Sequence, residues 1–271
     1  MIPIDRICIK EDKKIERLAN KINDAKKSGG PIIFMIGGAV IKEGCSLLLI
    51  DLLKKGFITH LAMNGSVSIH DFEIAMIGQT SEDVQDGLVD GSFGMAEETL
   101  VDMNSAIKSG YRRGIGYGRA VAEAIKKNKF KYREYSVLYQ AYKANVSLSV
   151  HVAIGGDIIH QHGSCDGAAL GATSYEDFKL LTGTLTEIDR GVVVNIGSAV
   201  IMPEVFLKAL TIARNVGFRH NNFTVANMDF LDMYRPRTRV LQWPESLGAE
   251  AISIKGRHNT TIPQLYGFLC A

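Results

Sequence analysis

The stretch that decides the fold is PIIFMIGGAVIKEGCSLLLIDLLKKGFITHLAMNG, residues 31–65. It contains two short apolar runs, 31–38 and 58–65, and each run ends in glycine. Between them, residues 45–56 have the apolar spacing of a helix that stops at Gly56. A strand, a glycine turn, a helix and a second strand form a βαβ unit, so this stretch predicts two parallel strands.

The apolar spacing of a middle section, 92–145, indicates helices. After it, the second half of the chain again alternates apolar runs, glycine turns and helices. Residues 10–28 read as a charged amphipathic helix. Further strands are expected at 146–156, 191–200, 223–230 and 249–256, and further helices at 174–188, 203–217 and 262–269. We therefore expect one domain, 1–271, of the α/β class, with a doubly wound, mostly parallel sheet and a helical insertion.

The composition excludes several classes of function. The chain has 271 residues, a net charge of +2 and 46% hydrophobic residues, which is typical of a globular protein without a nucleic-acid partner. No apolar run is long enough to span a membrane, and the N-terminus has no signal-peptide core. The four cysteines are widely scattered, which favours reduced thiols and a cytoplasmic location.

Glycine-rich segments follow four of the expected strands, at 36–40, 63–71, 154–162 and 195–200. In a doubly wound sheet, ligands bind where the strands end at their carboxyl edge. Glycines there let a ligand approach the backbone closely. Four such ends on one sheet predict a large ligand, of dinucleotide size. The alternative is that the glycines serve only to make tight turns.

Two of these segments also carry titratable side chains. His70, Asp71 and Glu73 follow the second strand, where His70 could act as an acid or a base near neutral pH. The alternative is a helix N-terminus whose acidic residues face the helix dipole. At 234–245, YRPRTRVLQWPE could form a lid or a subunit contact, or a solvated loop around Trp243.

The segment 151–171 concentrates three histidines, a cysteine and two aspartates. By residue type, His160, His162, Cys165 and Asp166 could bind zinc, although their spacing fits no paired zinc motif. Asp157 stands at a strand end, where an acid can hold a cationic substrate. A metal site, a metal-free pocket and a loop held by internal hydrogen bonds all remain open at this point. Further along, Ser174 and Asp177 have the spacing of a capping box, which predicts a helix start at Ser174.

Taken together, the order of these elements resembles the deoxyhypusine synthase family over nearly the whole chain. The resemblance rests on residues 32–78, YSVLYQAYKANVSLSVHVAIGGDIIH (135–160), VVVNIGSAV (192–200), FTVANMDF (223–230), Arg235-Pro236 and IPQLYGFL (262–269). It implies a Rossmann-like fold, NAD as cofactor, an amine substrate such as a polyamine, and a homo-oligomer, either a tetramer or a dimer.

The resemblance also implies roles for individual residues. The NAD-lining positions would be Gly37, Gly38, Ala39, Asn64, Gly65, Ser66, Gly197 and Ser198. Asp157 matches an acid that contacts the polyamine, and Trp243 falls near a tryptophan of the pocket. One departure is decisive: the family's catalytic lysine follows that tryptophan, whereas Pro244 and Glu245 stand here. A carboxylate cannot form the enzyme-imine. Whether Lys42, Lys208 or Lys255 replaces the lysine stays open.

The first half is also similar to the archaeal-type, NAD-dependent ornithine cyclodeaminase domain. The similarity rests on GGAVIKEG (37–44), NGSVSIHDFE (64–73) and MAEETLVDMNSAI (95–107). In that family an asparagine precedes a His-Asp-x-Glu cluster, which Asn64, His70, Asp71 and Glu73 match. Both resemblances imply chemistry at a C–N bond next to a carbon that gives hydride to NAD.

Our leading hypothesis is therefore an NAD-dependent enzyme that acts on a polyamine or a basic amino acid, and that is not a true deoxyhypusine synthase. Asp157, Asp71 and Glu73 would hold the ammonium group, and His70 or His160 would accept a proton. Trp243 and Glu245 would line the substrate pocket. Two alternatives are a metal-dependent hydrolase that uses His160, His162 and Cys165, and a non-catalytic relative that binds a nucleotide.

Overall fold

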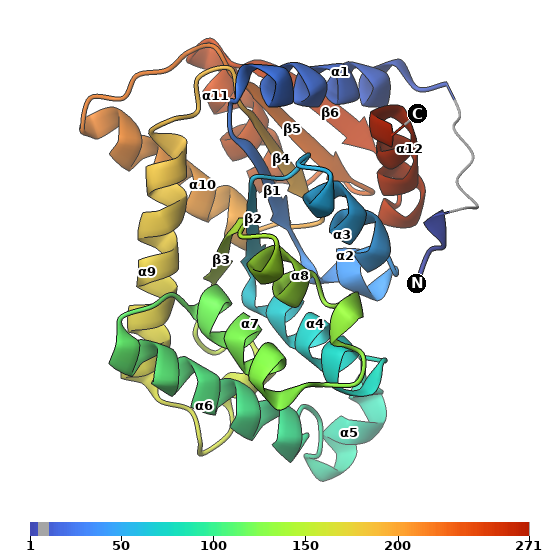
Figure 1. Cartoon of the computed structure of the whole chain (residues 1–271), viewed down its shortest axis with the longest axis vertical. Coiled ribbons are helices and arrows are strands. Elements are labelled where there is room, and N and C mark those ends of the chain that lie inside the picture. The colour runs from blue at the N-terminus through green and yellow to red at the C-terminus, as the bar shows by residue number, and fades with distance from the viewer. Residues whose placement is uncertain (5–10, 271) are drawn as a thin grey trace.

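The computed structural model describes residues 1–4 and 11–270, and its centre is one sheet of six parallel strands (Figure 1). The strands are β1 (Ile32–Ile36), β2 (His60–Asn64), β3 (Ser147–His151), β4 (Val192–Ile196), β5 (Thr224–Asp229) and β6 (Glu250–Lys255). Their order is β3-β2-β1-β4-β5-β6, and every neighbouring pair is parallel. This is the doubly wound, Rossmann-like order, so the expected fold class is confirmed.

Helices cover both faces of the sheet. They are α1 (Lys13–Ser28), α2 (Gly38–Lys42), α3 (Ser46–Lys54), α4 (Gly65–Ile77), α5 (Val84–Asp90), α6 (Glu97–Arg113), α7 (Tyr117–Asn128), α8 (Val137–Lys143), α9 (Gly167–Leu185), α10 (Ile201–Asn215), α11 (Trp243–Ser246) and α12 (His258–Cys270). Short helical turns are η2 (Arg133–Tyr135), η3 (Ile158–His160) and η4 (Pro236–Gln242). None of the helices in the described ranges combines the length and apolar character needed to cross a membrane.

The apolar run of β1 is fully buried because its side chains pack into the hydrophobic cores on both faces of the sheet. Ile32, Phe34 and Ile36 point to the side covered by α1, α3 and α12, whereas Ile33 and Met35 point to the side of α9 and α10. All five side chains are inaccessible to solvent. A parallel sheet covered on both faces needs continuous apolar strands rather than alternating ones, which explains the pattern of the opening stretch.

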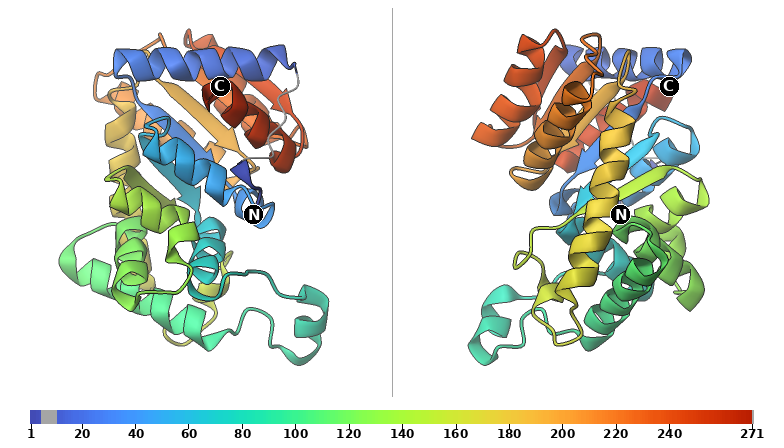
Figure 2. Two further views of the ribbon diagram at one scale, coloured as in Figure 1. Left: turned by 45° about the vertical axis from the view of Figure 1, so that its right-hand side comes forward. Right: turned by 90° about the vertical axis from the view of Figure 1, so that its left-hand side faces the viewer.

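The expected helical insertion lies beyond the carboxyl ends of β2 and β3. It contains α4 to α8, which occupy the lower half of the molecule in Figure 1. Among these, α5 stands away from the sheet at the edge of the molecule (Figure 2). The long helix α9 runs past the sheet into this region and packs on β3, α6 and α10.

Two details of the sequence prediction are wrong. The helix expected to start at Ser174 begins at Gly167, where the Asp166 carboxylate caps it. Asp177 is buried inside this helix, and its carboxylate accepts hydrogen bonds of 2.8 Å from the backbone N–H groups of Gly118 and Val150. It binds the edge strand instead of capping its own helix. Likewise, much of the segment 234–245 is helical rather than a loop, because η4 leads directly into α11.

A buried polar network crosses β2 and β3 beneath α9. His60 contacts the Thr184 hydroxyl at 2.8 Å and the Ser149 hydroxyl at 2.9 Å, and His151 contacts the same serine at 3.0 Å. Burial lowers the pKa of both His60 and His151 from 6.5 to about 3. Both imidazoles are therefore neutral in the folded protein at neutral pH.

This network makes a prediction for the variant His151→Gln. Below pH 6.5 the unfolded chain takes up a proton at His151 that the folded chain excludes, so acidification favours unfolding until the folded pKa is reached. Relative to the variant, the parent should lose about 1.4 kcal/mol of unfolding free energy per pH unit in that window. Urea unfolding of both proteins at several pH values above and below 6.5 measures this. Parallel pH curves would contradict the assignment.

Candidate functional site

The ends of β1 and β4 touch each other at the point where the strand order reverses. The Gly37 N–H donates to the Ile196 carbonyl over 2.9 Å. A Cβ placed on Gly37 would lie only 2.0 Å from the Gly197 carbonyl oxygen. Gly197 itself has a φ of +65°, and a Cβ there would come within 2.7 Å of His258 Nε2. Only glycine fits at either position, so the two tips form one backbone junction.

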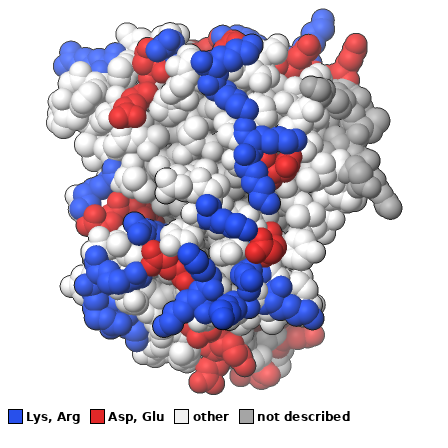
Figure 3. Space-filling model, in the orientation of Figure 1, with Lys and Arg blue, Asp and Glu red and all other residues white. Residues whose placement is uncertain are grey.

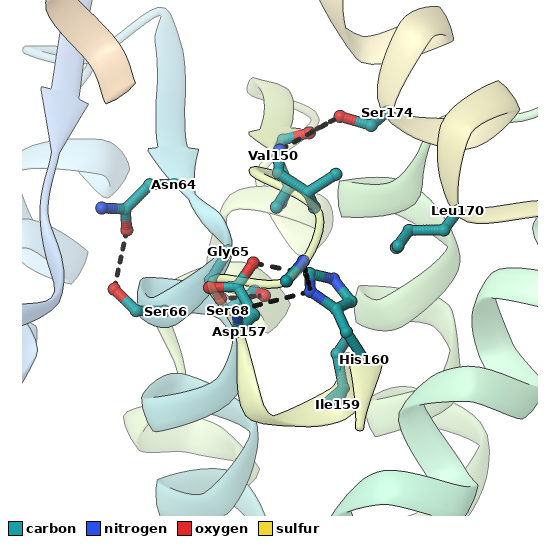
Figure 4. A network of polar contacts seen from close by, with 12 residues as sticks. Asn64, Gly65, Ser66, Ser68, Val150, Asp157, Ile159, His160, Leu170 and Ser174 are labelled. Carbon is teal, nitrogen blue, oxygen red and sulfur yellow. Dashed lines mark hydrogen bonds and ion pairs between the residues drawn. The ribbon is translucent and has the colours of Figure 1, made fainter. Parts of the chain in front are cut away.

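The same close approach continues from β1 to β2 and β3. A Cβ on Gly38 would lie 2.7 Å from the Ser66 Oγ, and the Ser66 hydroxyl donates to Asn64 Oδ1 over 2.9 Å. A Cβ on Gly65 would lie 1.9 Å from Asp157 Oδ2. Figure 4 shows Asn64, Ser66 and Asp157 gathered at these strand ends. The tips of four strands therefore meet along one edge, in the order β4, β1, β2, β3.

Asp157 and His160 form a buried pair at the end of this edge. The His160 Nδ1 accepts hydrogen bonds from the N–H groups of Gly155 and Asp157, at 3.1 and 3.3 Å (Figure 4). The proton of the neutral ring is therefore on Nε2, which lies 3.8 Å from Asp157 Oδ2. Neither of these two buried atoms has a hydrogen-bond partner. Burial raises the pKa of the Asp157 carboxyl to about 6.

This tautomer corrects one of the expected roles. Because His160 Nδ1 already accepts two backbone N–H groups and Nε2 carries the ring proton, neutral His160 has no free lone pair. It can donate a hydrogen bond toward Asp157 or a ligand, but it cannot serve as the proton acceptor. Of the two histidines expected to act as a base, the geometry leaves His70.

His70 is oriented by a relay through Thr80. The Thr80 hydroxyl donates to the Glu73 carboxylate, so it can accept only from His70 Nδ1–H, at 2.7 Å. The Nε2 lone pair of His70 is therefore free. Burial, assisted by the charge of Lys42, lowers the His70 pKa, which keeps the ring neutral near pH 7. The ring lies beside the Gly38 turn, with Cδ2 3.4 Å from a Cβ placed on that glycine.

These groups share a cavity of about 210 Å³. It is lined by Lys42 from α2, by Ser66, Ile69, His70 and Glu73 from α4, by Gly156, Asp157 and Ile158 after β3, and by Ser81, Glu82, Val84 and Phe93 around α5. Burial also raises the pKa of Glu73, against the lowering effect of the Thr80 hydrogen bond. Lysine, histidine and carboxylates thus line one space of the size of an amino acid.

Other expected site residues lie elsewhere. Asp71 is fully buried on the opposite side of α4, where it accepts hydrogen bonds from the Ser136 hydroxyl and from the N–H groups of Val137 and Leu138. It caps α8, so it cannot hold a substrate ammonium. Trp243 and Glu245 lie on α11 beside β6, and neither lines the cavity. Of the other two lysines considered, Lys208 pairs with Glu204 on α10.

The histidine and cysteine segment does not form a metal cluster, which is one of the three alternatives that its sequence leaves open. Within residues 1–4 and 11–270, no three His, Cys, Asp or Glu side chains come together as metal ligands. His162 Nδ1 contacts the Ser164 hydroxyl at 2.8 Å and accepts from the Ser164 N–H at 3.1 Å. The segment is held by local hydrogen bonds, and His160, His162 and Cys165 do not form the set of three ligands on which the hydrolase hypothesis rests.

One residue of the site escaped sequence reasoning altogether. Thr80 lies in the link between α4 and α5, and nothing in its spacing connects it with His70 or Glu73. Lys42 was one of three candidate lysines, and only the fold places it at the cavity. A polar residue shortly after a helix that carries a His-x-x-Glu pair is a weak signal that could have pointed to Thr80.

Comparison with known proteins gives one family and a common fold. Residues 16–157, just over half of the chain, match the family described as arginine dihydrolase ArgZ-like, C-terminal, Rossmann fold. An ornithine cyclodeaminase from Methanothermobacter thermautotrophicus is 31% identical over 64 residues, which are 24% of this chain and 16% of that protein.

Two solved structures place the fold more broadly. AgrE, in a ternary complex with ornithine and NAD⁺, matches 97% of this chain with a TM-score of 0.59 and 15% identity, and this chain covers 34% of it. A deoxyhypusine synthase-like protein from Entamoeba histolytica matches 94% with a TM-score of 0.57 and 10% identity, and 86% of that protein is covered. At these identities the likeness concerns the fold alone. The chain spans about a third of AgrE and about a sixth of the ornithine cyclodeaminase.

The contact between Gly65 and Asp157 makes a prediction for Gly65→Ala. Its methyl group would occupy the place of Asp157 Oδ2, so the carboxylate must move. We expect a loss of about 1–3 kcal/mol in unfolding free energy. Gly171→Ala, within α9 and with open space around its Cβ, is the matched control and should be neutral or stabilising by up to about 1 kcal/mol. Urea unfolding compares the two variants, and equal effects would contradict the described contact.

Proposed function

The chain belongs to the ArgZ-like family of C-terminal Rossmann-fold domains, and on this basis we propose that it is an NAD-dependent enzyme acting on a C–N bond of a basic amino acid. The observation that carries the proposal is the cavity at the joined strand tips. It combines a lysine, a histidine with a free lone pair and a buried carboxylate with an unpartnered oxygen.

The carboxyl edge of the sheet suits a dinucleotide. The strand order β3-β2-β1-β4-β5-β6 is the order in which dinucleotides bind across the reversal point. Gly37, Gly38, Ala39 and Gly197 would contribute backbone there, and Asn64 and Ser66 would contribute polar groups. Ser198 would contribute mainly backbone, because its side chain is buried and its hydroxyl accepts from the Met202 N–H. The cavity of about 210 Å³ is too small for a dinucleotide, which would lie along the open edge.

The charges in the cavity favour a basic amino acid over a polyamine. An amino acid carries a carboxylate that Lys42 can bind and an ammonium group that Asp157 can bind. A polyamine has only positive charges, and Lys42 would repel it. Glu73 and Glu82 line the same space and would favour a second ammonium group on the side chain of the substrate. AgrE, which shares the fold, was crystallised with ornithine and NAD⁺.

The residues of the cavity divide the proposed chemistry between them. Bound NAD would supply the acceptor for hydride from the carbon that carries the amine. Asp157 would hold the ammonium group, with His160 Nε2–H beside it. His70 would take up the proton that the amine loses, at its free Nε2. Glu73, acting through Thr80, would stabilise the ring when it becomes charged.

Calorimetry with Lys42→Met tests the substrate class. The parent should bind NAD and, in its presence, bind ornithine more tightly than putrescine, which lacks the carboxylate. Lys42→Met should bind ornithine about tenfold more weakly or worse. It should bind putrescine at least as tightly as the parent, because a repelling charge is gone, and leave NAD binding unchanged. Lys54→Met, an exposed lysine outside the cavity, is the matched control. Failure of the parent to bind NAD would overturn the proposal, and equal binding of the two ligands would overturn the assigned substrate class.

The pKa of Asp157 predicts how substrate binding depends on pH. An ionised carboxylate is needed to hold the ammonium group, and burial raises the Asp157 pKa to about 6. The affinity for ornithine should therefore be constant above pH 6 and fall about tenfold per pH unit below it. The variant Asp157→Asn should bind ornithine weakly, should not show this fall in affinity below pH 6, and should still bind NAD. If the variant showed the same fall in ornithine affinity below pH 6, Asp157 would be excluded as the group that causes it.

A further inference from the structure

The charges of this protein are strongly segregated along the chain. From residue 56 to residue 107 there is no lysine or arginine. Residues 108–143 then carry Lys108, Arg112, Arg113, Arg119, Lys126, Lys127, Lys129, Lys131, Arg133 and Lys143, against the acids Glu123 and Glu134 alone. The whole chain has a net charge of only +2, so this basic section is balanced by acidic surface elsewhere.

The acidic counterpart includes α5 and its flanks, residues 81–98, which we call the acidic arm. Its charged residues are Glu82, Asp83, Asp86, Asp90, Glu97 and Glu98. No residue of α5 is buried, and Leu88 and Val89 are 66% and 89% exposed. The arm stands out from the molecule (Figure 2). A helix that exposes large apolar side chains and buries none has an uncovered apolar surface.

The basic section borders a groove, which we call the basic groove. Its lining residues are Arg119, Lys126, Tyr139, Tyr142, Lys143, Asn145, Val146, Ser147, Leu148 and Leu180, and it has a volume of about 820 Å³. Tyrosine, valine and leucine form its apolar part, and Arg119, Lys126 and Lys143 are exposed at its margin. Figure 3 shows the concentration of basic side chains over α6, α7 and α8, with acidic side chains below them.

We propose that the acidic arm of one copy of this chain docks into the basic groove of a second copy. The two surfaces match in kind: a helix that exposes Leu88 and Val89 beside aspartates meets a groove of mixed apolar and polar lining edged by lysine and arginine. None of the residues that line the groove comes from the acidic arm of the same chain. A nucleic acid would satisfy the basic side chains, but it would leave Leu88, Val89 and the apolar groove residues uncovered.

This docking would also affect the cavity described above. Glu82, Val84 and Phe93 of the acidic arm form one wall of that cavity. A neighbouring molecule that holds the arm would fix this wall in place. The proposed association stands on the two surfaces alone and does not depend on the proposed reaction.

Sedimentation equilibrium with reciprocal charge reversals tests the proposal. At low salt the parent should self-associate, and high salt should weaken the association. Asp86→Lys with Asp90→Lys on the arm should raise the dissociation constant about tenfold or more, as should Lys126→Glu with Lys143→Glu in the groove. A mixture of the two double variants should associate again, because each supplies the complement of the other.

Two further variants separate this surface from general effects of charge. Lys13→Glu with Lys14→Glu on α1 makes the same change of net charge far from the groove and should leave the dissociation constant unchanged. Leu88→Ser with Val89→Ser should weaken association without changing charge. A parent that sediments as a monomer at low salt, or one whose association survives both charge reversals, would overturn the proposal. Circular dichroism of each variant verifies that it is folded.

Discussion

The backbone contact between Gly37 and Gly197 is the constraint on which the rest of the site depends. It joins the ends of the two central strands, where the chain leaves the sheet toward opposite faces. With no side chain at Gly37 or Gly197, the β1 turn can approach β4, and with none at Gly38 it can approach Ser66 on the other side. Asp157 can in turn lie against Gly65. A single methyl group at any of these steps would separate the strand tips and divide one continuous edge into separate turns.

The close packing of the strand ends explains why the glycines located this edge correctly but did not by themselves identify a ligand site. The glycines after β1, β2 and β4 mark the carboxyl edge correctly because parallel strands bring their ends together. What they do there differs from the first interpretation. They permit neighbouring tips to approach one another, so their presence alone does not demonstrate a ligand. The edge remains a place where a ligand can lie, but the cavity beside it and its charges carry that argument.

The positions of the strands and the parallel, doubly wound class of the sheet followed from periodicity, whereas the partners of individual side chains did not. Apolar runs such as 32–36 reveal a strand covered on both faces, and this requires no knowledge of what lies opposite. Asp71 and Glu73 are two positions apart and chemically alike, but they lie on different sides of α4, one at the start of α8 and one at the cavity. Asp177 looked like a cap because its hydrogen-bond partners, Gly118 and Val150, are distant in sequence. The tautomer of His160 depends on two backbone N–H groups that only a folded turn brings together.

Asp177 also affects the edge of the sheet at which another chain could add a strand. Val150 belongs to β3, at the open side of the sheet, and an edge strand with free amide groups is a template for adding another strand. The Asp177 carboxylate, which belongs to α9, accepts a hydrogen bond from the Val150 N–H. The Ser174 hydroxyl accepts from the Val152 N–H and donates to the Val150 carbonyl. Two side chains of the protein itself thus engage backbone groups that an added strand would need at this border.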